Sequence, residues 1–367
     1  MQLLNDDVIK VENPGTGGDD TRAWGPPYAP GTDGASDISA YFMAANRNKR
    51  SVAIDIASPE GQAQIRALAA ASDVVVENFK PGGLAKYGLD HESLLLAYPG
   101  LVYCSISGFG QTGPNREKPG YDLLAQGFGG MMSLTGEPEG QPMKVGVGIA
   151  DVMCGMYATI GILAALRHRD RTGEGQHIDV ALVDTQMAWL INEGTSYLAT
   201  GRVPERRGNG HPSIVPYHVF EASDGHVIVA VGNDGQFRRF CAVLGMPTLG
   251  SDPAYATNPA RLANREALMV TLRPALAARP MAEIVAALEG AGVPVGPVNT
   301  LDLALGSDQA AARGAVVEMA NPAMPGDRLR LLGNPLKLSR TPVTYRRPPP
   351  AFGQDTEEVI AGLPPAG

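Results

Sequence analysis

The first half of the chain alternates short runs rich in valine and isoleucine with longer segments of helical pattern, and this alternation limits the fold more than any other feature. Strands are expected at residues 7–12, 73–79, 101–107 and 176–182. Strands that alternate with helices form parallel sheets whose faces the helices cover. The sequence therefore predicts an open, parallel, Rossmann-like α/β sheet.

The pattern changes near residue 201, where a segment rich in proline and glycine begins. With 367 residues the chain exceeds the roughly 250–300 at which a single hydrophobic core stops growing, so we expect two domains. We assign residues 1–200 to a large α/β domain, 201–213 to a glycine-rich loop or linker, and 214–306 to a smaller α+β domain. Residues 307–367 have no core pattern of their own and are expected to return and pack on the large domain.

Charge and cysteine content argue against several classes of protein. A formal net charge of −8 without a block dense in lysine and arginine argues against nucleic-acid binding, which needs concentrated positive charge. The cysteines show no CxxC spacing and the histidines no metal spacing, so no metal site is expected. The uncharged run 152–166 is shorter than the roughly 20 residues that span a bilayer. Residues 1–14 show no secretion signal, and we expect a cytoplasmic protein without membrane contact.

Polar and glycine residues follow several of the expected strands. Asn13 follows the first strand, Asn78 and Phe79 end the second, and Gly108 and Gly110 follow the third. In open parallel sheets, ligands bind at the carboxyl ends of the strands. These positions form the candidate binding rim.

A single carboxylate, Asp151, precedes the uncharged run 152–166, which has the pattern of a buried helix. Asp151 could cap that helix by accepting backbone N–H bonds. It could equally be a nucleophile whose ionised form the helix N-terminus stabilises. The residues alone leave both interpretations open.

In the segment GVGIAD, Asp151 occupies the position where a dinucleotide fingerprint needs a small residue, which makes hydride transfer a weak interpretation.

Ordered blocks along nearly the whole chain resemble the family III CoA-transferases, the CaiB/BaiF group that includes formyl-CoA transferase and carnitine CoA-transferase. The blocks are DVIKVENPGTGGDDTRAWGPP, NRNKRSVAIDIASPEGQ, DVVVENFKPGGLAKYGLD, LVYCSISGFGQTGP, KPGYDLLAQGFGGMMSLTGEP, GIADVMCGMYATIGILAAL, RRGNGHPSIVPYHVF and VGNDGQFRRFC. The resemblance implies an interlocked homodimer and an enzyme that moves CoA from an acyl-CoA donor to a carboxylic acid. Coenzyme A would be a substrate, with no tightly bound cofactor.

By this resemblance, Asp151 matches the nucleophilic aspartate of the family. Its carboxylate would attack the acyl-CoA thioester to give an acyl–aspartyl anhydride, and the CoA thiolate would then form an aspartyl–CoA thioester. Tyr121 would lie close to the acyl centre. Gly208 and Gly210 match a flexible glycine-rich loop that covers the nucleophile and shields the anhydride from water.

The resemblance also implies CoA contacts along the strand-end rim. The matched residues are Asn13, Ile54, Ala57, Asn78, Phe79, Lys86 and Lys118. Ile54 and Ala57 would lie near the adenine, whereas Lys86 and Lys118 would supply local positive charge near the phosphates of an anionic substrate.

Two other functions stay open. The superfamily includes α-methylacyl-CoA racemases, whose GHD pattern is replaced here by Tyr121 after Gly120; the missing histidine removes an acid/base partner and favours transfer. The chain also opens at a point that corresponds to the second strand of the family, so a truncated, inactive CoA-binding paralogue is the other alternative.

The segment GNGHPSIVPYHVF resembles family members that use small dicarboxylates such as succinate or glutarate. Arg22, Arg206 and Arg207 are candidates for holding a distal carboxylate through paired N–H bonds, and each is equally well explained as a surface charge.

Overall fold

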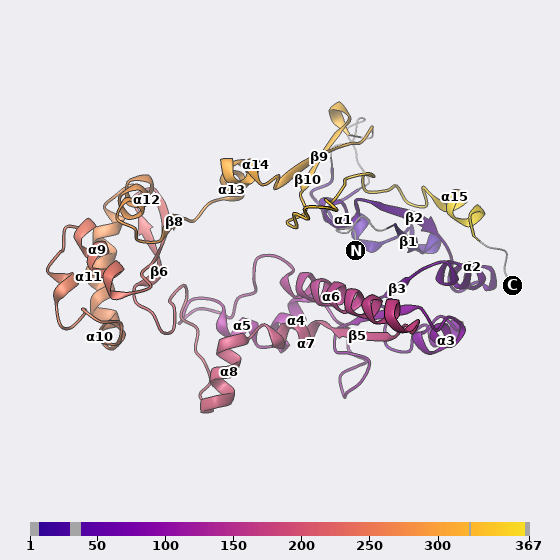
Figure 1. The fold of residues 1–367 in the computed structure, drawn as a ribbon, viewed down its shortest axis with the longest axis horizontal. Coiled ribbons are helices and arrows are strands. Elements are labelled where there is room, and N and C mark those ends of the chain that lie inside the picture. The colour runs from indigo at the N-terminus through magenta and orange to yellow at the C-terminus, as the bar shows by residue number, and fades with distance from the viewer. Residues whose placement is uncertain (1–6, 30–37, 323, 364–367) are drawn as a thin grey trace. The chain divides into compact units, whose positions relative to one another are not determined.

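The computed structural model describes residues 7–29, 38–322 and 324–363. The chain divides into two compact units (Figure 1). The first consists of Met1–Gly129, Gly146–Leu190 and Leu305–Gly367, and the second of Gly130–Val145 and Ile191–Ala304. The segment that returns after residue 304 therefore belongs to the first unit.

Parallel strands build the main sheets of the first unit. β1 (Val8–Glu12) pairs with β2 (Lys49–Ala53), while β4 (Val102–Ser107) lies between β3 (Val74–Glu77) and β5 (His177–Ala181). All three pairings are parallel, which confirms the predicted α/β class. Within the described residues, these five strands form two sheets that no ladder of hydrogen bonds joins.

The long helix α6 (Ile149–Thr172) covers one face of the three-stranded sheet. Its buried residues recur at helical spacing and pack on β4 and β5; they are Ala150, Cys154, Ala158, Ile162 and Ala165. The opposite face is apolar but exposed, at Val152, Met156, Tyr157, Ile160 and Leu163. The expectation of a buried helix is met on one face only, because the sheet covers one side. By length and composition α6 could also cross a membrane, a weak indication that core helices share.

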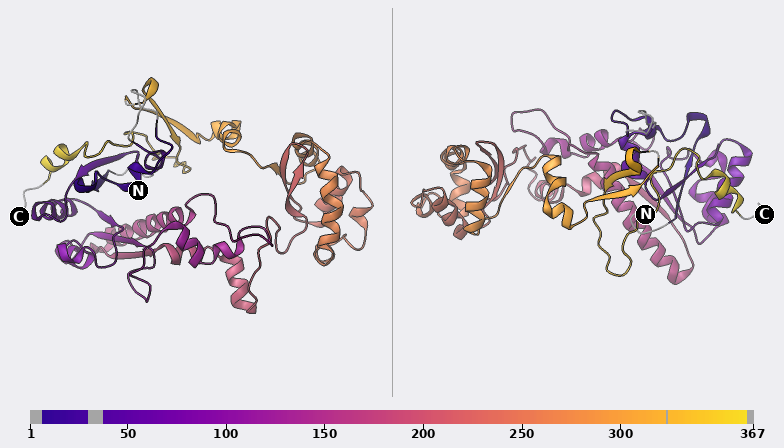
Figure 2. Two further views of the ribbon diagram at one scale, coloured as in Figure 1. Left: turned by 180° about the vertical axis from the view of Figure 1, so that it is seen from behind. Right: turned by 90° about the horizontal axis from the view of Figure 1, so that it is seen from above.

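Helix α2 (Pro59–Ala70) packs on both sheets. It begins as a capped helix should, since the Ser58 hydroxyl accepts the Gly61 N–H at 2.9 Å. Leu68 joins the cluster around β2, and Ala69 joins the cluster beneath β3 and β4. The C-terminal helix α15 (Thr356–Ala361) inserts Val359 into the same β2 cluster. Figure 2 shows this yellow helix beside the indigo strands near the N-terminus.

The second unit contains an antiparallel sheet covered by helices, which confirms the smaller α+β part of the prediction. β7 (Gly225–Ala230) lies between β6 (Tyr217–Ala222) and β8 (Val295–Pro297). Helices α9 (Asp234–Val243), α11 (Arg265–Ala277) and α12 (Met281–Gly290) cover it. Their shared core includes Phe220, Val229, Phe237, Phe240, Leu268 and Leu272.

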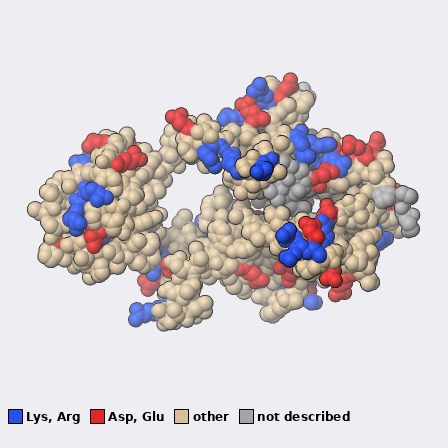
Figure 3. Space-filling model, in the orientation of Figure 1, with Lys and Arg blue, Asp and Glu red and all other residues tan. Residues whose placement is uncertain are grey.

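Shorter elements complete the two units. The remaining helices are α1 (Ala40–Asn46), α3 (His91–Ala97), α4 (Asp122–Phe128), α5 (Met131–Leu134), α7 (Leu182–Ala188), α8 (Ile191–Thr200), α10 (Asn258–Ala263), α13 (Leu301–Gly306) and α14 (Asp308–Ala312). β9 (Val316–Ala320) and β10 (Arg328–Leu332) form an antiparallel pair in the return segment. Acidic and basic side chains are interspersed on the face shown in Figure 3.

Candidate active site

Asp151 lies in the first turn of α6, two residues after the helix begins at Ile149. The preceding residue, Gly148, has no side chain with which to cap the helix. Asp151 is exposed, and no hydrogen bond to its carboxylate is found within the described part of the chain. The interpretation of Asp151 as an N-cap is therefore wrong, and its carboxylate is available for chemistry.

The cap of α6 comes from another helix. Asp122, the first residue of α4, accepts the Ala150 N–H on Oδ1 at 2.8 Å and the Gln126 Nε2–H on Oδ2 at 2.7 Å. No motif considered in the sequence singled out Asp122. The usable signals were its position directly after Gly120-Tyr121 and the pairing of an aspartate with a glutamine four residues later on one helix.

Two glycines bring α4 to this position. A side chain at Gly108 would begin 2.4 Å from the Gly120 Cα, so the backbone after β4 touches the backbone that leads into α4. The Gly108 carbonyl also accepts the Val183 N–H at 3.1 Å, which ties the start of α7 to the same point. Close backbone contact of this kind requires glycine.

Burial and, second, the Asp122 carboxylate raise the pKa of Asp151 above its ordinary value. That the helix N-terminus stabilises the ionised form of Asp151 stays a prediction. Both carboxylates lie within 4 Å of the point where a side chain at Gly148 would begin. A more basic carboxylate is a stronger nucleophile once it is ionised. Burial and the charge of Asp151 raise the pKa of the Cys154 thiol to about 11, so this neighbour stays a neutral thiol.

Two tyrosines accompany the carboxylates. Tyr121 directly precedes Asp122, and 61% of its surface is exposed. Burial, followed by the charges of Asp151 and Asp122, raises the pKa of Tyr41 on α1, so its phenol lies within the field of both acids. The Tyr41 ring also meets Trp24 edge to face, with centroids 5.1 Å apart.

The residues matched to CoA contacts lie on loops that follow strands or lead into α4. Asn13, Ala57, Asn78, Phe79, Lys86 and Lys118 are exposed. Ile54 differs, because only 3% of its surface is exposed and its side chain packs in the β2 cluster. Its contribution to a ligand would be limited to the backbone. Asn13 is already used locally, since its Oδ1 accepts the Gly15 N–H at 2.8 Å.

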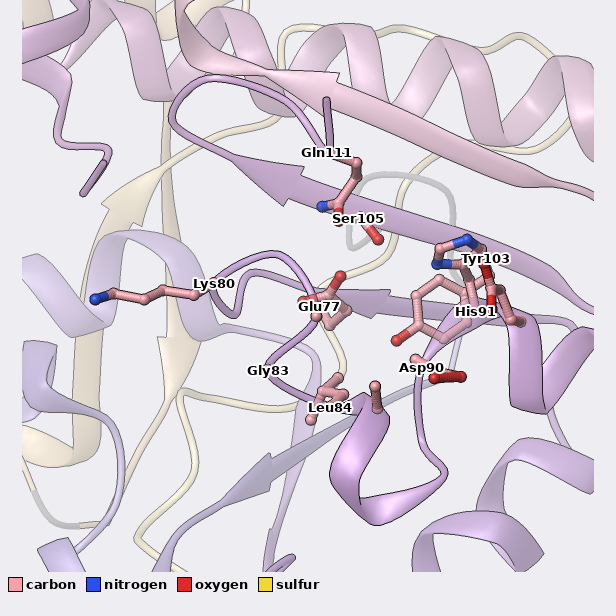
Figure 4. A pocket seen from close by; sticks show the side chains of 12 residues that line it. Glu77, Lys80, Gly83, Leu84, Asp90, His91, Tyr103, Ser105 and Gln111 are labelled. Carbon is pink, nitrogen blue, oxygen red and sulfur yellow. The ribbon is translucent and has the colours of Figure 1, made fainter. Parts of the chain in front are cut away.

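A pocket beside the carboxyl ends of β3 and β4 contains a cluster of titratable groups (Figure 4). His91 and His177 stack with ring centroids 3.8 Å apart, and His177 Nε2 lies 3.0 Å from the Ser105 hydroxyl. Burial raises the pKa of Glu77. The lining holds Glu77, Asp90 and Glu92 against a single lysine, Lys80, which extends away from the cluster in Figure 4. The pocket is therefore poorly suited to phosphate groups.

In the second unit, the glycine-rich loop is held at both ends. Arg206 donates to the carbonyls of Glu137 and Gly140, at 3.2 and 2.7 Å. Arg265 donates to the carbonyls of His211 and Pro212, at 2.9 and 3.2 Å. The same contacts explain why Gly130–Val145, expected in the large domain, belongs to the second unit.

The predicted glycines serve a tight turn within this loop. Gly208 has a φ of +55° and donates its N–H to the Gly136 carbonyl at 3.2 Å. The Gly210 N–H bonds back to the Arg207 carbonyl at 3.0 Å. The structure therefore shows a turn held by hydrogen bonds, and the role of this loop as a cover for the nucleophile stays a prediction.

The three arginines considered for a distal carboxylate have internal partners. Arg22 forms a buried ion pair with Glu12, Arg206 binds backbone carbonyls, and Arg207 lies 3.3 Å from the Glu193 carboxylate. Each of the three guanidinium groups therefore already has a partner within the protein.

The chain is similar to known proteins along nearly its whole length. The model of the CoA-transferase family III matches residues 6–356. The chain belongs to this family. It is 48% identical to a succinate–glutarate CoA-transferase of Agrobacterium fabrum over 99% of this chain and 90% of that protein. It is 38% identical to the human succinyl-CoA:glutarate CoA-transferase over 97% of this chain and 80% of that protein.

A solved structure shows the same fold. A CaiB/BaiF family protein from Brucella suis superposes with a TM-score of 0.87 and is 44% identical, covering 99% of this chain and 94% of that one. The prediction of an acyl-CoA:carboxylate CoA-transferase is thus confirmed.

Proposed function

We propose that this CoA-transferase moves CoA between succinate and a longer dicarboxylate such as glutarate, with Asp151 as the covalent carrier. The relatives named above support the substrate class. The observation that carries the mechanism is the exposed carboxylate of Asp151 in the first turn of α6, beside Asp122.

The reaction would proceed through acyl exchanges on Asp151. Its carboxylate attacks the thioester carbonyl and the carbon–sulfur bond breaks, so that CoA leaves as a thiolate and a mixed anhydride of the donor acid and Asp151 remains. The thiolate attacks the aspartyl carbonyl, which releases the donor acid and leaves an aspartyl–CoA thioester. The acceptor carboxylate attacks this thioester to form a second anhydride, and the returning thiolate takes the acceptor acyl group and frees Asp151.

The environment of Asp151 favours this series of reaction steps. The backbone N–H groups at the start of α6 attract negative charge, and Asp122 already uses the one on Ala150. Because Asp122 also makes Asp151 more basic, its neighbour strengthens the nucleophile. Tyr121, which directly precedes Asp122, keeps its predicted role at the acyl group.

Coenzyme A would bind along the strand-end rim. Asn78 and Phe79 follow β3, and the exposed Lys86 and Lys118 offer local positive charge for the phosphates on an acidic protein. The acidic pocket beside them is a poor alternative site for these groups.

We further propose that the chain works as a homodimer, with the exposed side of α6 as part of the contact. This side carries an apolar row at Val152, Met156, Ile160 and Leu163, and exposed apolar patches of this kind mark interaction sites.

A substrate panel tests the proposal. Purified enzyme is given succinyl-CoA and, in separate reactions, malonate, glutarate, adipate, acetate or butyrate, and acyl-CoA products are separated by chromatography. We expect glutaryl-CoA as the main product. Transfer to monocarboxylates alone would contradict the substrate class, and deuterium entering the α-carbon of a branched acyl-CoA without any acceptor acid would favour a racemase.

A further inference from the structure

Gln126 is a fully buried polar residue close to the candidate nucleophile. It lies four residues after Asp122 on α4, and none of its surface is exposed. Its Nε2 donates to Asp122 Oδ2 at 2.7 Å. A buried amide costs free energy unless its hydrogen bonds are made, so this contact constrains both side chains.

The Asp122 carboxylate connects Gln126 to α6. Its second oxygen, Oδ1, accepts the N–H of Ala150, the residue directly before Asp151. With one oxygen held by each partner, the carboxylate cannot rotate without losing a hydrogen bond. The amide of Gln126 thus fixes the group that caps the turn carrying Asp151.

We propose that Gln126 is a positioning residue for CoA transfer, which holds Asp122 against the first turn of α6 and thereby fixes the Asp151 carboxylate. The inference rests on the proposed function, because it takes Asp151 as the nucleophile. Attack on a thioester requires the reacting atoms about 3–3.5 Å apart and aligned, and a misplacement of about 1 Å can cost about a hundredfold in rate.

Gln186 on α7 provides a matched control. It is also fully buried, but neither its amide nitrogen nor its amide oxygen has a hydrogen-bond partner within the described residues. Replacing either glutamine with methionine keeps the length and removes the amide. Only Gln126→Met removes a hydrogen bond to Asp122.

The first experiment compares Gln126→Met with Gln186→Met in the full-length enzyme, with succinyl-CoA and glutarate as substrates. For Gln126→Met we expect kcat to fall about ten- to a hundredfold while the KM for succinyl-CoA changes less than about twofold. Gln186→Met should keep both constants, and thermal unfolding checks that both variants fold. If Gln126→Met does not fold, Gln126→Asn, one methylene too short to reach Asp122, replaces it.

A double-variant cycle shows whether Gln126 acts through Asp122. Asp122→Ala removes the carboxylate that Gln126 and Ala150 share, so adding Gln126→Met to it should lower kcat little further. If the losses of kcat in the two single variants multiply in the double variant, the inference is overturned. A wild-type kcat for Gln126→Met would also overturn it. Either result would leave the proposed function standing. Full activity of Asp151→Asn would instead overturn the proposed function.

Discussion

Replacing Arg22 with methionine should reduce stability and leave dicarboxylate recognition intact. Arg22 Nη2 and Nε donate to the two Glu12 carboxylate oxygens at 2.7 and 2.8 Å, and Nη1 donates to the Pro350 carbonyl at 3.1 Å. Only 9% of Arg22 and 3% of Glu12 are exposed. All three guanidinium nitrogens therefore donate to groups of the protein, and Arg22 cannot also bind a substrate carboxylate.

The loss of stability in Arg22→Met depends on the hydrogen bonds that Glu12 keeps. Breaking a buried ion pair by removing one partner costs about 3–5 kcal/mol. Glu12 would retain the Ser51 hydroxyl at 2.6 Å and the Asp19 N–H at 2.9 Å, so we expect the lower end, about 3 kcal/mol. That corresponds to a fall in Tm of about 6–12 °C.

The loss should depend on pH with a defined sign. Burial raises the pKa of Glu12, but hydrogen bonds from Arg22, Ser51 and Asp19 outweigh it and hold the pKa below its ordinary value. Because the folded-state pKa lies below the unfolded one, this stabilisation is present above the unfolded pKa and disappears as the pH falls through the folded one. The Tm gap between wild type and Arg22→Met should therefore narrow in acid.

The assay combines thermal unfolding at neutral and acidic pH with the KM for glutarate. Arg50→Met is the control, because Arg50 pairs with the exposed Asp7 and Glu358 and should cost less than about 1 kcal/mol. A wild-type Tm for Arg22→Met together with a tenfold higher KM for glutarate would refute the reasoning and make Arg22 a substrate ligand.

Three further predictions concern other sites. Asp122→Asn should move the acidic limb of the kcat/KM profile to lower pH, because the Asp122 charge helps to raise the pKa of Asp151; an unmoved limb would contradict this. Gly108→Ala should lower Tm and activity, because its Cβ would lie 2.4 Å from the Gly120 Cα; a normal Tm would contradict that contact. Burial and Lys10 lower the pKa of Lys49 to about 8, so its charge costs stability at pH 7 and Lys49→Met should raise Tm there. That gain should shrink as the pH rises from about 8 to about 10.4, where Lys49 is neutral in both states, and a constant gain would contradict the assignment.

The strands could be predicted because local pattern determines them. Runs of β-branched residues between helical segments gave β1, β3, β4 and β5 close to their observed ends. The division into two sheets depends on which strands meet in space, and no short-range pattern encodes that.

The proposed nucleophile stands out in the sequence, whereas the residue that caps its helix does not. Asp151 stands out as the one carboxylate before an uncharged helix. Asp122 reaches α6 from far along the chain, and only because Gly108 and Gly120 allow two backbones to touch. Similarly, the lack of charge on α6 indicated an apolar surface but not that the sheet covers only one side.

Arginine roles were the least predictable part of the site. Arg22 and Arg206 read as free positive charges in the sequence. In the structure, a buried carboxylate and a row of backbone carbonyls bind them, and both arrangements arise from loop conformations.

Trapping the covalent intermediate tests the central claim most directly. The enzyme is incubated with succinyl-CoA and hydroxylamine, which attacks an aspartyl thioester, releases CoA and leaves a hydroxamate on the side chain. Peptide mass spectrometry should find this mass change on Asp151, and Asp151→Asn should lose both the modification and more than about a thousandfold in kcat. A hydroxamate on a different residue, or full transfer by Asp151→Asn, would contradict the account.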